Sequence, residues 1–299
     1  MSETSYAPLA PQWGGPWAIA PERAKTALTL LSATVEAGMS DQAMQIDAAS
    51  RPRSRVDAGA VAVIPLQGVM AQRWGPIGEM LGGASSDAVG RAVTEAAADD
   101  RIGAIVLHVN SPGGSVYGLP ELAQRVRQAR EVKPVVAQAD SLAASAAYWV
   151  ASQASEIVAS PGADVGSIGV LMLREDASGA LEKAGVDPSI VYAGRYKTEG
   201  NPFEPLGDEA RAHLQARVDA AYTDFLAAVA VGRGVTQGQV EARFGQGRMV
   251  RDVDAKEAGM VDRIATFDET LARLGAGRAS GGRGRQAERL MMRLRLERS

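Results

Sequence analysis

A single serine stands inside a run of small residues where an apolar segment gives way to a helical one. Ser145 is flanked by alanines on both sides, in the segment ADSLAASAAYWVAS at 139–152. Small neighbours let a substrate backbone approach, and the start of a helix supplies a positive dipole end. The residue is therefore a candidate nucleophile, and the alternative is a cap on a tightly packed helix.

A serine nucleophile needs a base that accepts its proton. Arginine does not deprotonate in proteins, whereas a lysine amine acts as a base once burial lowers its pKa. The lysines of this chain are Lys25, Lys133, Lys183, Lys197 and Lys256. Lys197 follows an apolar run and lies in the polar segment AGRYKTEGNPFEPL, which makes it the best candidate. The alternative is an ordinary surface lysine.

Two glycine-containing segments could support this chemistry. HVNSPGGSV at 108–116 contains Gly113 and Gly114, and adjacent glycines bring backbone N–H groups close to whatever lies before them. Such donors can hold a developing oxyanion at the end of a strand. Ser167, in GADVGSIGV, could hydrogen-bond a neutral lysine amine and orient it. Tight turns without chemistry are the alternative for both segments.

The composition excludes several other kinds of site. Without cysteine there is no disulfide framework and no thiol nucleophile. The chain has two histidines, His108 and His213, so a zinc site of several histidines is hard to build, and we expect neither metal nor cofactor. A Ser–His–Asp hydrolase needs a histidine shortly after the nucleophile helix, whereas His213 lies in an amphipathic helical segment. A crotonase-type coenzyme A enzyme would leave Lys197 without a role.

The elements that must position these residues alternate along the chain. Apolar runs predict strands at 61–66, 102–109, 134–139, 156–160, 167–173, 189–194 and 260–265. Helical spacing predicts helices at 86–99, 119–130, 144–154, 177–184, 208–232, 236–243 and 255–259. Apolar strands that alternate with helices are typical of an α/β domain with a buried, largely parallel sheet.

The two ends of the chain differ from this middle part. Residues 1–57 are interpreted as an extended arm rich in proline, glycine and tryptophan, a helix from Pro21 and a linker, followed by a catalytic domain at 58–274. Residues 275–299 are interpreted as a flexible arginine-rich tail that could contact an acidic partner. The acidic body shows no sign of nucleic-acid binding, and no membrane segment is visible, so the expected location is the cytoplasm.

In order along the chain, several blocks resemble the signal peptide peptidase A family of serine proteases (SppA and SohB). This family includes phage head-maturation proteases of the lambda C-protein type. The blocks lie between about residues 61 and 264: VAVIPLQGVM, DRIGAIVLHVNSPGG, AASAAYWVAS, DVGSIGV, GRYKTEGNPF and KEAGMVDRI. The resemblance implies a spiral of strand–strand–helix units similar to ClpP and crotonase. It also implies a homo-oligomer whose sites face inward.

The same resemblance implies a role for each candidate residue. Ser145 matches the nucleophile of a Ser–Lys dyad, and Lys197 matches its general base. The N–H of Gly114, next to Gly113, matches the oxyanion hole, and Ser167 matches the residue that orients the lysine.

The first residues of the chain indicate a branch of that family. They contain no membrane anchor, and PQWGGPWAIAPER resembles the opening of phage and prophage members. The implied function is cleavage of scaffold or capsid proteins during phage head maturation, with phage scaffold, portal or capsid proteins as partners, in the host cytoplasm or the assembling procapsid. The alternatives are a peptidase for signal peptides or misfolded proteins that lacks an anchor, and a catalytically silent capsid scaffolding protein.

Overall fold

The computed structural model describes residues 15–20, 60–74 and 82–275. The expected helix from Pro21, the linker at 39–57 and the tail beyond residue 275 lie outside these residues. The strands are β1 (Trp17–Ile19), β2 (Ala60–Gln67), β3 (Met70–Ala71), β4 (Ala84–Ser85), β5 (Ile102–Ser111), β6 (Gly113–Ser115), β7 (Val135–Ala144), β8 (Glu156–Ala159), β9 (Asp164–Gly166), β10 (Met249–Arg251) and β11 (Arg263–Ile264). The helices are α3 (Ser86–Ala98), α4 (Leu119–Val132), α5 (Ala146–Ala151), α6 (Ser178–Lys183), α7 (Asp208–Arg233), α8 (Gln237–Arg243), α9 (Asp252–Ala258) and one at 267–275.

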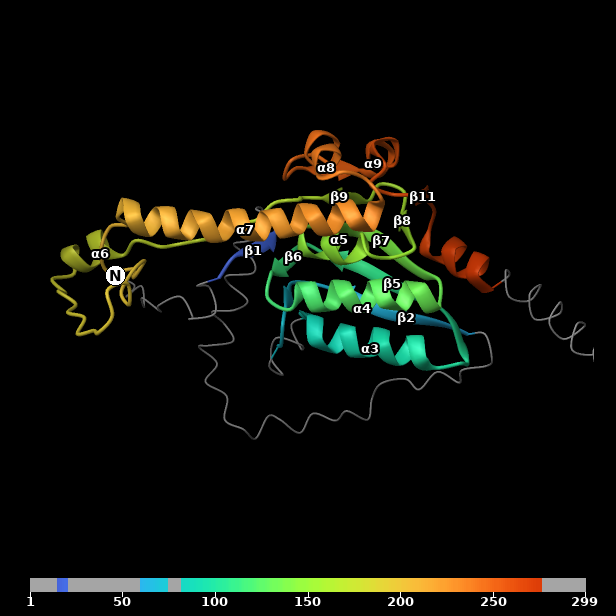
Figure 1. Ribbon diagram of the computed structural model, residues 1–299, viewed down its shortest axis with the longest axis horizontal. Helices are drawn as coiled ribbons and strands as arrows, with labels where there is room; N and C mark the ends of the chain where they lie inside the picture. The colour runs from blue at the N-terminus through green and yellow to red at the C-terminus, as the bar shows by residue number, and fades with distance from the viewer. Residues whose placement is uncertain (1–14, 21–59, 75–81, 276–299) are drawn as a thin grey trace, which may run out of the picture.

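A mainly parallel sheet forms the centre of the body (Figure 1). Its strands lie in the order β10-β9-β7-β5-β2, β8 also pairs with β7, and β11 pairs with β8. Neighbouring strands are parallel except for β10 and β9. The first half of β7 pairs with β8 and its second half with β9, so the sheet divides toward the carboxyl end of β7. The expected α/β class with a parallel sheet is confirmed.

Two successive units have the same order of elements. The long strand β2 is followed by the short strands β3 and β4 and then α3, and β5 is followed by β6 and then α4. The short strands form a second sheet in the order β1-β6-β3-β4. This arrangement agrees with the expected strand–strand–helix units. Because β6 begins two residues after β5 ends, the second sheet starts at the carboxyl edge of the main sheet.

Helices cover both faces of the main sheet. Ile105 and Leu107 of β5 belong to one buried cluster with residues of α3, α4 and α5. Val106, between them, belongs to a second cluster, against which Phe267 and Leu271 of the helix at 267–275 pack. Successive strand side chains point to opposite faces, so a strand covered on both sides must be apolar throughout.

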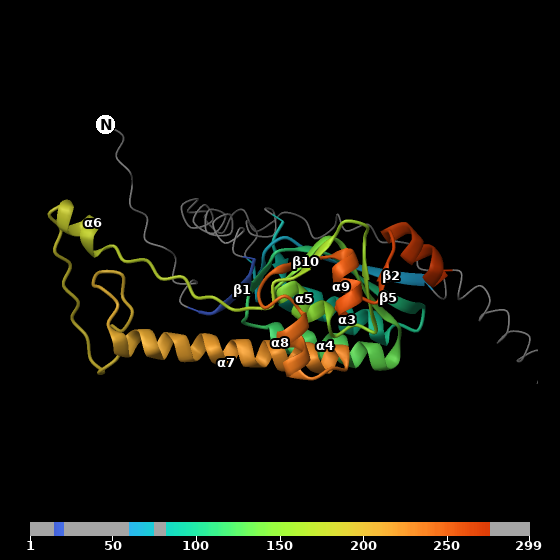
Figure 2. The ribbon, with the colours of Figure 1, turned by 90° about the horizontal axis from the view of Figure 1, so that it is seen from above.

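Helix α7 joins the body to a projecting part of the molecule. It has 26 residues and is therefore about 39 Å long. Phe225, in its second half, stacks on Trp149 of α5 with ring centroids 4.8 Å apart. Its first half extends beyond the body beside α6 and the segment that joins them, as both views show (Figures 1 and 2). We call residues 173–210 the arm.

Two expected strands are wrong. In 167–173 only Leu171 makes a strand-like pairing, with Trp17, because Gly166 and Ser167 have positive φ values and turn the backbone. The expected strand at 189–194 is exposed coil on the arm, away from both described sheets, and Val191 is fully exposed. The expected helix at 144–154 is shorter, because β7 continues to Ala144.

Candidate active site

Ser145 lies in a sharp turn between β7 and α5. Its φ of 54° and ψ of −118° are mirror-image turn values that favour glycine, a conformation that costs about 1–3 kcal/mol for other residues. The Ser145 N–H donates to the Gly166 carbonyl oxygen at 2.7 Å, and its hydroxyl donates to the Gly169 oxygen at 3.4 Å. A strained strand-to-helix turn is a known way of presenting a nucleophilic serine.

Gly113 brings the backbone of β6 directly against this serine. A Cβ atom at Gly113 would lie 2.9 Å from Ser145 Cβ, 2.9 Å from the Ala146 nitrogen and 2.3 Å from the Ala18 carbonyl oxygen. Its φ of 96° also lies in the region that favours glycine. A side chain at this position would therefore fill the space in front of Ser145.

Close packing also requires the second glycine of the pair. A Cβ atom at Gly114 would lie 1.9 Å from the carbonyl oxygen of Met70. The preceding turn is held by Ser111, whose hydroxyl donates to the Gly68 oxygen at 2.6 Å and accepts the Gly113 N–H at 3.2 Å. Ser111 thus orients the glycine pair, and the SPGG segment is the sequence signal that could have identified it.

Ser167 lies near Ser145, because the residues on either side of Ser167 contact that serine. Gly166 and Gly169 supply the carbonyl oxygens that accept the two hydrogen bonds from Ser145. Ser167 itself is buried, has a φ of 51° and donates its N–H to the Arg248 oxygen at 2.9 Å. The structure therefore brings Ser145, Gly113 and Ser167 into one neighbourhood.

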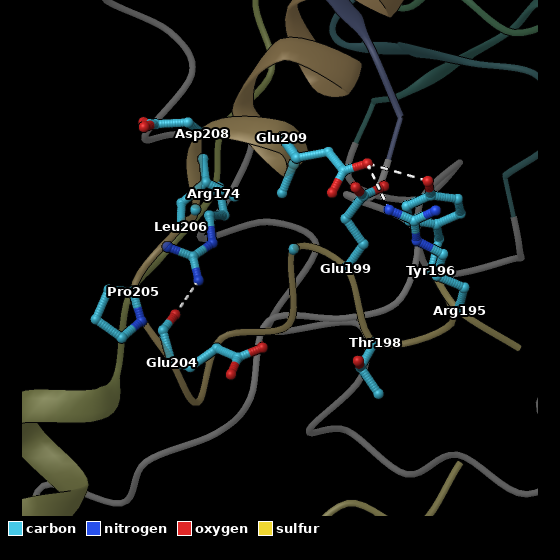
Figure 3. A pocket seen from close by; sticks show the side chains of 13 residues that line it. Arg174, Arg195, Tyr196, Thr198, Glu199, Glu204, Pro205, Leu206, Asp208 and Glu209 are labelled. Atoms are coloured by element: carbon cyan, nitrogen blue, oxygen red, sulfur yellow. Dashed lines mark hydrogen bonds and ion pairs between the residues drawn. The ribbon is translucent and has the colours of Figure 1, made fainter. Parts of the chain in front are cut away.

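Lys197 lies elsewhere, on the arm. Its side chain is exposed, and its N–H donates to the Gly194 oxygen at 3.0 Å. Its neighbours Tyr196 and Thr198 line a cavity of about 420 Å³ that also includes Asp208 and Glu209 at the start of α7 (Figure 3). Ser145 is not among the residues that line this cavity.

One hydrogen bond and one ion pair join the Lys197 segment to α7, and Arg174 holds the loop between them. The Tyr196 hydroxyl donates to Glu209 at 3.0 Å, and this contact raises the pKa of Tyr196. Arg195 lies 3.6 Å from the same carboxylate. The Arg174 guanidinium donates to the Glu204 carbonyl oxygen (Figure 3). It also donates to the carbonyl oxygen of Asn201 at 2.6 Å.

The length of α7 separates the lysine from the serine within one chain. The helix touches the Lys197 segment at Glu209 and touches α5 at Phe225. These 16 residues correspond to about 24 Å of helix. In both views the arm lies at the far end of α7 from the body (Figures 1 and 2). One chain alone therefore does not place Lys197 next to Ser145.

Lys133 and the two histidines have other surroundings. Lys133 donates its ammonium to the carbonyl oxygens of Ala96 and Asp99, at the C-terminal end of α3. His108 stacks on Phe267 with ring centroids 4.4 Å apart, on the sheet face opposite α5. His213 is exposed on α7. These contacts give none of the three a place beside Ser145.

Among residues 15–20, 60–74 and 82–275, no group of three or more His, Asp or Glu side chains is arranged to hold a metal ion. No helix in the same residues is long and apolar enough to cross a membrane.

One segment reaches the site although its sequence predicts only part of an extended N-terminal region. In residues 15–20, β1 pairs with β6 and places the Ala18 carbonyl oxygen beside Gly113. The Ala146 N–H is a second group that the sequence does not single out, and as the first of its helix it has no intrahelical acceptor. The apolar stretch WAIA between two prolines is the signal that could have identified a strand at 17–20.

Three curated proteins show the range of similar chains. The head-tail preconnector protein GP5 of Enterobacteria phage P21 is 32% identical over 225 residues, which are 75% of this chain and 44% of that protein. The capsid assembly protease C of Escherichia phage lambda is 31% identical over 228 residues, 75% of this chain and 51% of that protein. MJ0651 of Methanocaldococcus jannaschii is 36% identical over 176 residues, 59% of this chain and 56% of that protein. The matches thus span about half the length of each relative.

A comparison with protein families matches the second half of the chain to one family. The Peptidase family S49 profile matches residues 127–279, which include the Ser145 turn, the Ser167 segment and the arm with Lys197. The matched region is just over half of the chain. On the evidence of this sequence match, the chain belongs to Peptidase family S49.

Proposed function

We propose that this chain is a serine endopeptidase in which Ser145 is the nucleophile and Lys197 the general base. The observation that carries the proposal is the contact between the Gly113 backbone and Ser145, with only 2.9 Å between the serine Cβ and the point where a Gly113 side chain would begin. A side chain at residue 113 would obstruct Ser145, so glycine is the residue that lets the backbone of β6 lie beside the serine. Family membership supports the same chemistry.

In this mechanism Lys197 accepts the proton of the Ser145 hydroxyl while the oxygen attacks the substrate carbonyl carbon. The N–H groups of Gly114 and Ala146 stabilise the negative charge that develops on the carbonyl oxygen. The lysine then donates its proton to the leaving amine, which breaks the peptide bond and leaves an acyl group on Ser145. Water, deprotonated by the lysine, hydrolyses this ester. Ser167 would orient the amine.

The base must come from a second copy of the chain. Lys197 is exposed on the arm, whereas Ser145 is fully buried in the body of its own chain. The arm also exposes apolar side chains that a partner would cover: Leu173, Val186, Ile190, Val191, Tyr192, Tyr196 and Phe203. A homo-oligomer in which the arm of one copy reaches the Ser145 of the next satisfies both observations.

Mixing two inactive variants tests this arrangement. Ser145→Ala and Lys197→Ala should each lack peptidase activity, and co-assembled in equal amounts they should recover about one quarter of the wild-type rate, because one site in four then joins an intact serine to an intact lysine. A dyad within a single chain would give no recovery. The control is Lys183→Ala, another exposed lysine of the arm, which should stay active alone.

For the substrate, we propose polypeptides of a phage head. The support is the similarity to the lambda capsid assembly protease C and to GP5 of phage P21 over 75% of the chain. The test is coexpression with the head proteins of the phage or prophage that encodes the chain. Wild-type protein should shorten at least one of them and Ser145→Ala should shorten none. Identical head proteins in the two samples would contradict this substrate assignment.

A further inference from the structure

Residues 15–20 lie as an extended strand between two segments of the candidate active site. On one side β1 pairs antiparallel with β6, and Val116 and Ala20 extend this ladder by donating N–H groups to Pro16 and Pro112. On the other side Trp17 and Leu171 exchange two backbone hydrogen bonds of 2.8 Å. Figure 1 shows β1 beside β6 at the edge of the body that faces the arm. β1 thus fills the space between β6 and Leu171, and its backbone is hydrogen-bonded on both sides.

The register of this strand places one peptide carbonyl at the nucleophile. Ala18 is the partner of Gly114, and the hydrogen bonds two residues away on either side put this pair in a hydrogen-bonding position. The Gly114 N–H therefore points at the Ala18 carbonyl oxygen. This oxygen lies 2.3 Å from the point where a Gly113 Cβ would be, and that point is 2.9 Å from both Ser145 Cβ and the Ala146 nitrogen.

These contacts are those that a bound polypeptide substrate requires. Proteins recognise extended peptides by adding them as a strand to a free edge, so that backbone hydrogen bonds supply affinity and alternate side chains supply specificity. A peptide to be cut must also place a carbonyl group between the serine and the oxyanion donors. The Ala18 carbonyl is held by the N–H of Gly114, one of the two proposed oxyanion donors, and it lies beside the contact between Gly113 and Ser145. Residues 15–20 are buried throughout.

We propose that residues 15–20 occupy the substrate groove of their own chain as a built-in substrate mimic, so that the groove opens only when this segment leaves. The proposal rests on the peptidase function proposed above. It also identifies the substrate class: an extended polypeptide with a small residue before the scissile bond. Ala18 has no exposed surface and belongs to the main buried cluster, so its place accepts a methyl group and excludes a larger side chain.

A disulfide that holds residues 15–20 in place tests whether this segment blocks the substrate groove. Trp17 and Ser115 are partners in a non-hydrogen-bonded antiparallel position, where Cα atoms are about 4.5 Å apart, a separation that a disulfide spans. The natural chain has no cysteine, so Trp17→Cys with Ser115→Cys can form only this bond within one chain. Oxidation should lower hydrolysis of a fluorogenic peptide at least about ten-fold, and reduction should restore it. Trp17→Cys alone is the control and should not respond to oxidant.

The outcomes separate the two proposals. A reduced variant and a wild type that both lack hydrolysis would contradict the peptidase function itself. An active reduced variant that stays equally active after complete oxidation, measured by mass spectrometry, would overturn the mimic and make β1 a structural strand only. Failure to form the bond in folded protein would overturn the placement. If the first variant does not fold, Pro16→Cys with Val116→Cys repeats the test with Trp17 in place.

Two peptides test the substrate class. The reduced double-cysteine variant should cut Gly-Pro-Trp-Ala-Ile-Ala at the Ala–Ile bond, with a kcat/KM at least about ten-fold higher than for the same peptide with Leu in place of the first Ala. Equal values, or faster cleavage of the leucine peptide, would overturn the assignment of a small residue at this position.

Discussion

The backbone N–H of Ser145 donates a 2.7 Å hydrogen bond to the carbonyl oxygen of Gly166, so the last residue of β9 holds the turn that presents the serine. Ser145 has backbone angles that suit glycine, and this bond is one of the contacts that keep it there. The position of Ser145, the proposed nucleophile, and the strain of its backbone are therefore linked, and substitutions at residue 145 should change activity and stability in different directions.

Replacing Ser145 by glycine and by alanine separates these two effects. Both variants should lose at least about 1,000-fold in hydrolysis, because each removes the attacking oxygen. Ser145→Gly should be about 1 kcal/mol more stable to unfolding than Ser145→Ala, since glycine adopts a φ of 54° without a Cβ penalty. Urea denaturation measures the difference. Ser141→Ala, at an exposed position of β7, should keep its activity, and equal stability of the two 145 variants would contradict the strain argument.

Gly113→Ala should damage both activity and stability. The new methyl group would lie within 3 Å of the Ala18 oxygen, the Ala146 nitrogen and Ser145 Cβ. We expect kcat/KM to fall at least about 100-fold and the free energy of unfolding to fall by about 2 kcal/mol. Gly238→Ala is the matched control: its Cβ would meet nothing within 4 Å in α8, so it should be neutral or stabilise by up to about 1 kcal/mol. Normal hydrolysis by Gly113→Ala would place the active site elsewhere.

Lys197→Arg should be inactive, because a guanidinium does not deprotonate and so cannot accept the proton of the serine. Initial rates on a fluorogenic peptide, with and without a metal chelator, provide the measurement, and the chelator should have no effect. Activity in Lys197→Arg would remove the lysine from the mechanism.

Asp262→Asn should destabilise the protein at neutral pH. Burial alone would raise the pKa of Asp262, but hydrogen bonds from Arg233, at 2.6 Å, and from the Ile157 N–H, at 2.7 Å, outweigh it and lower the pKa below its usual value. A lowered pKa in the folded state means that the carboxylate stabilises the fold above its unfolded pKa of about 4. That stabilisation is lost as the pH falls through the folded pKa.

We therefore expect Asp262→Asn to cost about 1–2 kcal/mol at pH 7, and the difference from wild type to narrow below pH 4. Urea unfolding at pH 7 and pH 3 measures both values. Asp100→Asn, at an exposed turn after α3, is the control and should change little at either pH. A cost for Asp262→Asn that is independent of pH would show that the charge of the carboxylate is not what stabilises the fold.

Most helices and strands of the described residues could be predicted from local sequence patterns. The amphipathic helix expected at 208–232 is α7, and Thr236 caps α8 with a reciprocal hydrogen-bond pattern with Gln239. Strands such as β5 are apolar on both faces because helices cover both sides of the sheet. Periodicity and capping are local properties, so the chain reveals them before it folds.

Where local pattern and environment disagreed, the prediction was wrong. The apolar run at 189–194 has the composition of a buried strand, yet it lies on the arm with Val191 fully exposed. Apolar composition indicates that a segment is stabilised by burial, but it does not indicate whether the covering surface belongs to the same chain. The segment at 167–173 failed for a different reason, because the positive φ values of Gly166 and Ser167 interrupt it.

For the candidate site, too, some features are evident from the sequence and others only from the tertiary structure. From the sequence alone came a serine among alanines, a glycine pair after a proline, and the lysine that best suits a base. Only the tertiary structure decided that Gly113 touches Ser145, that Lys197 lies apart from both, and that Ala18 lies in front of the serine. The physical reason is that residue type reflects which chemistry and which backbone angles are accessible. Proximity instead depends on pairings between separate strands, such as Ser111 with Ala143 and Ala18 with Gly114, which no local pattern encodes.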